Sequence, residues 1–165
     1  MRAFVDSNIA VYALGPEDDP RCWGARAVLG RHGSACEIVV STQVMLETYN
    51  VLRRKKKALP AQALAAARML MRYEVVTPSA TAALAALTLA AEHGLPTDDA
   101  FIVQAALEGG CDTLYSEDLQ AGRRFGHLVV VNPFDAAAHE PAPTVPAATP
   151  PSVTPRAAAK RKRKT

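Results

Sequence analysis

The sequence has few cysteines, histidines and aromatic residues, and this scarcity excludes several kinds of site. Its three cysteines are odd in number and far apart, which argues against a disulfide framework or a zinc site and favours a reducing cytosol. The four histidines show no spacing typical of metal ligands. Aromatic residues make up 5% of the chain and hydrophobic residues 49%, so we expect a core of mostly small side chains packed between helices.

Long apolar runs are also missing. The longest, residues 82–91, is short, rich in alanine and interrupted by Thr88, so it predicts a buried helix rather than a membrane span. The apolar run at the amino terminus is too short for a signal peptide and ends at Asp6. We therefore expect a cytoplasmic protein.

Positive charge is concentrated at one end of the chain. The formal net charge is +3, but residues 1–134 hold 13 Lys and Arg against 14 Asp and Glu, whereas residues 135–165 hold 6 against 2. The second segment is rich in Pro and Ala, lacks large apolar side chains and ends in the run KRKRK, Lys160 to Lys164. The sequence thus predicts one folded domain over 1–134 and a disordered tail with a basic end over 135–165.

The first 134 residues alternate between short strand-like runs and longer helical stretches. Strands are expected over 3–5, 37–40, 73–76, 113–115 and 128–131, and helices over 20–31, 43–55, 61–72, 79–92 and 98–108. Short β-branched strands separated by helices imply right-handed crossovers and a parallel sheet covered on both faces. We predict an α/β fold with three α/β/α layers and a five-stranded, mainly parallel sheet.

Four acidic residues lie near the ends of these strands or at the start of helices: Asp6, Glu47, Asp99 and Asp118. In a parallel sheet such positions share the carboxyl edge, where functional groups gather. Two bare carboxylates about 4 Å apart repel by about 4 kcal/mol at an effective dielectric near 20, so a cluster of four implies bound cations. Oxygen-only ligands select hard ions such as Mg²⁺ or Mn²⁺, which bind phosphates and activate water.

Each acid has a simpler interpretation when it is considered alone. Asp6, Asp99 and Asp118 are each placed to cap a helix or turn. Glu47 is compatible with the edge of an apolar helical stripe, although a charge there is costly unless it is paired.

Two neighbouring acids complicate the assignment. Asp98 precedes Asp99 but points about 100° away around the helix. Asp99 shares the apolar face that includes Ile102, which makes it the better candidate. Glu117 stands directly before Asp118 and leaves the identity of the fourth acid open.

The chain resembles the PIN-domain ribonucleases, most closely the VapC-like toxins of bacterial toxin–antitoxin modules. The resemblance covers roughly residues 2–134 and rests on the segments FVDSNI, STQVMLETYNVL, DDAFIVQAAL, GCDTLYSEDLQAG and RFGHLVVVNPF. It implies that Asp6, Glu47, Asp99 and Asp118 hold Mg²⁺ or Mn²⁺ and that Asn8 and Ser116 support the site. It further implies a sheet of five parallel strands flanked by helices, a homodimer, and a cognate antitoxin that occupies the acidic groove. Nothing in the resemblance extends to the tail.

The chemistry implied is metal-dependent hydrolysis of RNA phosphodiester bonds, with the four carboxylates as the catalytic groups because they hold the ion. An acidic site must still attract an anionic polymer. Five consecutive basic residues exceed what capping a helix requires, so we predict that they contact the RNA backbone: Arg53, Arg54, Lys55, Lys56 and Lys57.

Parts of this pattern also occur in other classes of protein. A phosphatase with an aspartyl nucleophile would need a second Asp at the position of Asn8, and a receiver domain would need paired acids before its central strand. A non-catalytic nucleic-acid or partner-binding module of the same fold would keep the basic run but lose acids, and the acid set is intact. A nuclease that acts on DNA is the remaining alternative.

Overall fold

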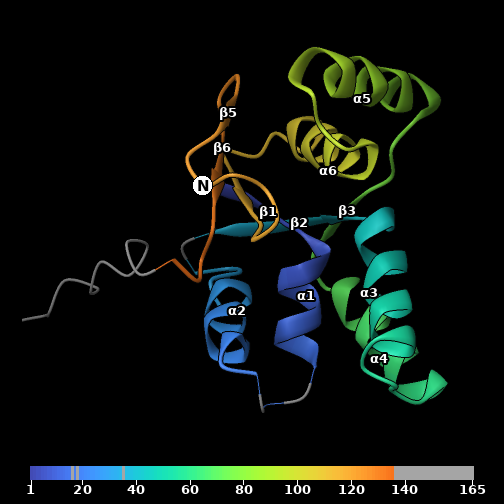
Figure 1. Cartoon of the computed structure of the whole chain (residues 1–165). Coiled ribbons are helices and arrows are strands. Elements are labelled where there is room, and N and C mark those ends of the chain that lie inside the picture. Colours follow the sequence, from blue (N-terminus) through green and yellow to red (C-terminus); the bar gives the residue numbers. More distant parts are fainter. Residues whose placement is uncertain (16, 18, 35, 136–165) are drawn as a thin grey trace, which may run out of the picture.

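The computed structural model describes residues 1–15, 17, 19–34 and 36–135. The elements follow in the order β1 (Arg2–Val5), α1 (Ser7–Leu14), α2 (Arg21–Leu29), β2 (Glu37–Ser41), α3 (Thr42–Arg54), α4 (Pro60–Leu70), β3 (Glu74–Val76), α5 (Ala80–His93), α6 (Thr97–Glu108), β4 (Thr113–Tyr115), β5 (Arg124–Phe125) and β6 (Leu128–Val131) (Figure 1). Almost all of the predicted tail, from residue 136 onward, lies outside the described residues.

The strands form one sheet in the order β3-β2-β1-β4-β6-β5. The first five strands of this order are the predicted ones, and each pairs with its neighbour in parallel. The two-residue strand β5 was not predicted, and it pairs antiparallel with β6 at the edge. The α/β prediction with a mainly parallel sheet is therefore confirmed, with one short strand added.

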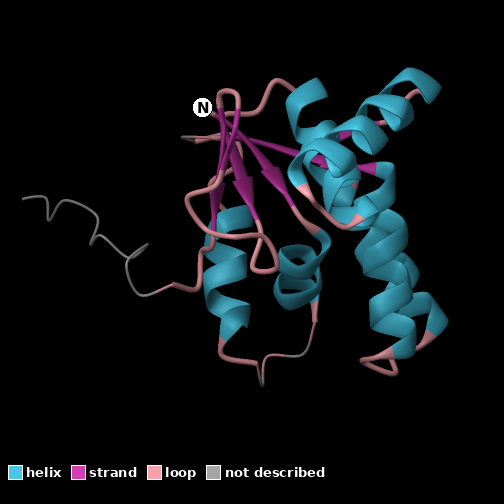
Figure 2. Ribbon diagram, turned by 45° about the horizontal axis from the view of Figure 1, so that its top comes forward, coloured by secondary structure: helices cyan, strands magenta, loops and turns pink. Residues whose placement is uncertain are grey.

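Helices cover both faces of the sheet. Figure 1 shows α5 and α6 on one side, and α1 to α4 on the other. Figure 2, turned by 45°, shows the strands fanning out between these two groups (Figure 2). Across the described residues, no helix combines the length and the apolar character that a membrane crossing requires.

The central strands form the core because both of their faces are covered. Ala3, Phe4 and Val5 of β1 are fully buried, and so is the run 38–40 of β2. Strands buried on both faces are continuously apolar rather than alternating, which is why short hydrophobic runs were sufficient to predict them.

The parallel register brings the carboxyl ends of β1 and β4 together. Val5 lies opposite Tyr115, and the backbone N–H of Asp6 donates to the Tyr115 carbonyl at 3.0 Å. The next residue of the β4 segment, Ser116, donates its N–H to the Val131 carbonyl at 3.1 Å. Asp6 and Ser116 therefore leave the sheet side by side.

Candidate active site

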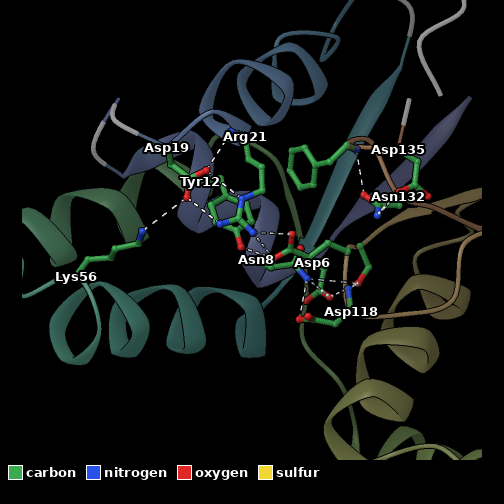
Figure 3. Close-up of polar contacts among 12 residues, drawn as sticks. Asp6, Asn8, Tyr12, Asp19, Arg21, Lys56, Asp118, Asn132 and Asp135 are labelled. Atoms are coloured by element: carbon green, nitrogen blue, oxygen red, sulfur yellow. Dashed lines mark hydrogen bonds and ion pairs between the residues drawn. The ribbon is translucent and has the colours of Figure 1, made fainter. Parts of the chain in front are cut away.

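Asp6 is a buried carboxylate at the point where β1 becomes α1. The residue is 6% exposed. One oxygen, Oδ1, accepts the N–H of Ser7 at 2.6 Å and caps α1, while the other, Oδ2, accepts the hydroxyl of Ser116 at 2.7 Å (Figure 3). The capping interpretation and the site interpretation of Asp6 are thus compatible, because each uses a different oxygen.

Asn8 links this carboxylate to Asp118. Its amide nitrogen Nδ2 lies 3.3 Å from Asp6 Oδ2, 3.0 Å from Asp118 Oδ2 and 3.4 Å from Ser116 Oγ. The carbonyl oxygen Oδ1 of Asn8 is buried and has no hydrogen-bond partner among the described residues. One side chain in the first turn of α1 therefore orients two acids and leaves an acceptor oxygen unused.

Ser116 fixes the loop that carries Asp118. It is fully buried, and its Oγ accepts the N–H groups of Asp118 at 3.2 Å and of Leu119 at 3.4 Å. No helix follows β4 within the described residues, so Asp118 does not cap one. Its exposed carboxylate is held at the edge of the sheet by Ser116 and Asn8.

Glu47 and Asp99 approach the same edge from helices on opposite sides of the sheet. Glu47 lies on α3, is half-buried, and accepts a bond from the side-chain amide of Gln43 at 2.8 Å. Asp99 lies in the first turn of α6 and is half-buried, whereas Asp98 is exposed, as their different helical faces predict. Neither Glu47 nor Asp99 has a hydrogen bond to Asp6 or Asp118 among the described contacts.

Burial and the charges of Glu47 and Asp118 raise the pKa values of both Asp6 and Asp99. Burial raises the pKa of Asp6 to about 6, an effect opposed by the bonds from Ser116 and Ser7 and reinforced by the charges of Glu47 and Asp118.

The pKa of Asp99 is raised by the same two causes. Burial raises its pKa, and the charges of Asp118, Asp98 and Glu47 raise it further. The carboxylates predicted from the sequence thus share one region of negative potential at the carboxyl edge of the sheet.

This cluster suits a divalent cation in charge and in donor type. The side chains that meet here carry carboxylate, amide and hydroxyl oxygens, which hard ions prefer, and the unpartnered oxygen of Asn8 adds an acceptor. As the side chains stand, however, no three Asp, Glu, His or Cys residues within the described part of the chain lie close enough to hold an ion between them.

Glu117, the alternative to Asp118, is already paired elsewhere. The hydroxyl of Tyr12 donates to its Oε1, and Nη1 of Arg21 lies 3.1 Å from its Oε2. The Arg21 guanidinium also lies 4.0 Å above the ring of Tyr12 and forms a two-point contact with Asp19, with both distances at 3.0 Å (Figure 3). Of the two adjacent acids, only Asp118 is bonded to Asn8 among the described contacts.

This pairing network was not predicted from the sequence. Tyr12, Arg21 and Glu117 are far apart in the chain, and no spacing or motif connects them before the fold is known. Gln43 was also missed, although its position four residues before Glu47 is a helical neighbour relationship that could have indicated the contact.

The predicted RNA-binding run 53–57 spans the carboxyl end of α3, and all five residues are exposed. Arg53 donates to the carbonyl of Ala58 at 2.6 Å, and the ammonium of Lys56 lies 3.9 Å from Asp19. Two of the five, Lys55 and Lys56, line a cleft that Asn8 and Asp118 also line. The structure thus brings part of the basic run next to the acid cluster.

Comparisons with known proteins give a consistent picture. Residues 3–124 match the family model described as "PIN domain". No curated protein sequence matches the chain significantly.

Several solved structures share the fold. VapC20 of Mycobacterium tuberculosis, described as a toxin that cleaves the sarcin–ricin loop, is 20% identical with a TM-score of 0.59, covering 69% of this chain and 88% of its own. VapBC2 of Rickettsia felis, bound to a DNA fragment from its promoter, is 20% identical with a TM-score of 0.56, covering 79% and 97%. A toxin–antitoxin complex from Klebsiella pneumoniae is 18% identical with a TM-score of 0.60, covering 81% and 98%.

At these identities the likeness to solved structures concerns the fold. The family model is more specific, because it spans well over half of the chain, from β1 to the beginning of β5, and includes all four clustered acids. The chain belongs to the PIN-domain family.

Proposed function

We propose that this protein is a ribonuclease that hydrolyses RNA phosphodiester bonds with the help of Mg²⁺ or Mn²⁺. We further propose that it acts in the cytoplasm as the toxin of a toxin–antitoxin module. The observation that carries the proposal is the convergence of four carboxylates at the carboxyl edge of the sheet, where burial and the charges of Glu47 and Asp118 raise the pKa values of Asp6 and Asp99. Membership of the PIN-domain family supports it.

The residues of the chain would have distinct roles in this reaction. Asp6, Glu47, Asp99 and Asp118 would hold the ion. A divalent ion bound there would lower the pKa of a water molecule and offset the negative charge of the scissile phosphate.

The surrounding polar groups would hold the carboxylates in place. The hydroxyl of Ser116 and the N–H of Ser7 each donate to one oxygen of Asp6. The side-chain amide of Asn8 donates to both Asp6 and Asp118 and so holds these two carboxylates close together. The basic run Arg53 to Lys57 would supply positive charge for the RNA backbone.

The first test replaces single acids without changing their size. Asp6→Asn or Asp99→Asn should reduce RNA cleavage about a hundredfold or more, because metal stabilisation is worth several kcal/mol and each 1.36 kcal/mol is tenfold in rate. Cleavage of a labelled RNA is measured with Mg²⁺, with Mn²⁺ and with EDTA, and DNA of the same sequence is tested alongside.

Asp98→Asn is the matched control, since it removes the same charge from the same turn of α6 at an exposed position. It should retain most of the activity. Full activity of Asp6→Asn or Asp99→Asn would show that these acids do not form the metal site. Preferential cleavage of DNA would show that the protein is a DNA nuclease.

We further propose that a cognate antitoxin inhibits this protein and that the protein forms a homodimer. Two of the structurally similar proteins are complexes named for both components, VapBC2 and the Klebsiella toxin–antitoxin complex. A partner that inserts Arg or Lys among the clustered acids would form charge-assisted hydrogen bonds with them and block the site.

The inhibition model is tested by growth. Expression of the protein should arrest growth, and co-expression of the small protein encoded immediately upstream should restore it. If growth stays arrested although the two proteins form a stable complex, the inhibition model is wrong. Sedimentation of the isolated protein tests the homodimer.

A further inference from the structure

A cleft of about 480 Å³ lies directly beside the carboxylate cluster. It is bounded by α1, by the end of α3 and by the loop after β4. Asn8 and Asp118, which belong to the cluster, form one of its walls, so the cleft and the cluster are continuous. Its volume falls in the range of about 300 to 1,000 Å³ that is typical of small-molecule sites.

The side chains that line this cleft suit a nucleotide. Lys55 and Lys56 extend from the end of α3, and Val11 and Val51 add apolar surface from α1 and α3. A cationic wall and an apolar surface in one cleft match the two parts of a nucleotide, its phosphate and its ribose and base.

The cations differ in how strongly they are already engaged. Arg21 also lines the cleft, but Asp19 and Glu117 pair with it at 3.0 and 3.1 Å (Figure 3). Lys56 lies 3.9 Å from Asp19, at the outer limit of an ion pair. Lys55 has no carboxylate within 4.0 Å among the described residues. Lys55 and Lys56 are thus the lining cations with capacity for an incoming anion.

We propose that this cleft binds the nucleotide next to the scissile phosphate, with Lys55 and Lys56 contacting the phosphate of that nucleotide. The inference rests on the proposed ribonuclease function and refines it, because it divides the basic run. Arg53 donates to the Ala58 carbonyl, and neither Arg53 nor Arg54 lines the cleft. These two contribute to the general positive field, whereas Lys55 and Lys56 form a positioned contact.

The test is a scan in which each phosphate of a short RNA is replaced in turn by a neutral methylphosphonate. Binding is measured for the full-length protein with Ca²⁺ in place of Mg²⁺, so that cleavage is suppressed. The cut position is determined separately with Mg²⁺. The variant is the double substitution Lys55→Gln and Lys56→Gln.

A matched control is Arg68→Gln with Arg72→Gln. It also removes two exposed positive charges, but from the last turn of α4 and the residues after it, and neither arginine lines the cleft. Melting curves of both variants establish that they fold.

The wild type and the control should lose about tenfold in affinity when a phosphate adjacent to the cut position is neutralised, as expected for a hydrogen bond between charged groups. The Lys55/Lys56 variant should bind the unmodified RNA about tenfold more weakly and should be insensitive to that one replacement. Its slope of log affinity against log salt should be shallower by about 0.7, since both lysines contact one phosphate and each neutralised single-strand phosphate contributes about 0.7.

The proposal is overturned if the Lys55/Lys56 variant responds to every methylphosphonate as the wild type does, or if it loses no more affinity than the Arg68/Arg72 control. Failure of the ribonuclease assignment gives a different result, namely no cleavage of RNA by the wild type with Mg²⁺ or Mn²⁺. The scan then still decides whether Lys55 and Lys56 contact a single phosphate, because it measures binding alone.

Discussion

Asp6 both caps α1 and belongs to the acid cluster. A side chain with a single acceptor atom could not do both. The two oxygens of Asp6 point to different partners, Oδ1 to the N–H of Ser7 and Oδ2 to the hydroxyl of Ser116. The sequence identified Asp6 as a candidate only in combination with the other three acids, because Asp6 alone is equally explained as a helix cap. It was not sufficient to predict the second partner, since Ser116 is 110 positions away and only the pairing of β1 with β4 brings it close.

The buried position of Asp6 makes the stability of the metal-free protein depend on pH. The pKa of Asp6 is about 6 in the folded state, against an ordinary value of 3.8. Between these two values the folded protein retains a proton that the unfolded chain has released. The free energy of unfolding should therefore fall as the pH rises from about 4 to about 6, by about 2 to 3 kcal/mol if other groups do not compensate. Urea denaturation in EDTA at several pH values measures this.

Asp6→Asn isolates the contribution of this one carboxyl. Asparagine cannot ionise but keeps an oxygen that can accept the bond from Ser7. The variant should match the wild type near pH 4 and exceed its stability near pH 7.5, whereas Asp98→Asn should keep the wild-type pH profile. A decrease in stability of the same size at every pH would contradict this account.

At the scale of helices and strands, the elements that could be predicted are those marked by an apolar run or a capping residue in their own sequence. The five parallel strands are short apolar runs, and α5 ends where Gly94 adopts φ of +63°, a conformation that glycine adopts without strain. Helix α1 was not among the predicted helical stretches, although the interpretation of Asp6 as a cap implies a helix there, because its sequence SNIAVYAL is continuously apolar from Ile9 onward and has no helical periodicity. Strand β5 has only two residues and forms by pairing with β6, so it has no periodicity of its own.

The network around Glu117 connects three elements that carry or adjoin the acid cluster. Tyr12 comes from α1, Arg21 begins α2, and Glu117 precedes Asp118 in the loop after β4. Because Glu117 is paired with Tyr12 and Arg21, the loop is held in the orientation in which Asp118 accepts the hydrogen bond from Asn8. The network therefore holds the Asp118 loop against α1 and α2.

Tyr12→Phe removes the hydroxyl that donates to Glu117 and keeps the ring that lies under Arg21. The free energy of unfolding should fall by about 1 kcal/mol, less than the usual value for a bond to a charged group because Arg21 still pairs with Glu117. Tyr49→Phe is the matched control, since the described contacts include no hydrogen bond from the Tyr49 hydroxyl. Equal effects of the two substitutions in urea denaturation would show that the Glu117 bond adds nothing to stability.

At the scale of the whole molecule, the acidic site and the positive charge occupy different parts of the chain. Residues 136–165 hold 6 basic residues and a single acid, whereas residues 1–135 hold 13 basic residues against 15 acids. The prediction that the tail is disordered falls outside the described residues and remains a prediction. Its charge alone is sufficient to expect an attraction to RNA.

The boundary for testing the tail follows from the last described residues. Asn132 donates to Asp135 at 3.0 Å and accepts the N–H of Phe134 at 3.0 Å, and the ring of Phe134 lies edge-on to Tyr12 with the centroids 5.5 Å apart. A truncation after Asp135 keeps these interactions, whereas one after Phe134 would remove the partner of Asn132. The cut therefore belongs after Asp135.

Truncation after Asp135 should weaken binding to a nonspecific RNA at low salt and make the salt dependence shallower, by about 0.7 in slope for each phosphate that the tail binds in the full-length protein. Turnover of saturating substrate should be unchanged, because the four clustered acids lie within the retained domain. Binding is measured by salt titration with Ca²⁺ in place of Mg²⁺. A full-length variant with the six basic tail residues, Arg156 and Lys160 to Lys164, changed to Gln is the matched control, since it keeps the length of the tail and removes only its positive charge. If the truncated protein and the Gln variant both give salt curves that superimpose on that of the wild type, the tail has no part in RNA binding. If only the truncation weakens binding, the length of the tail matters and its charge does not.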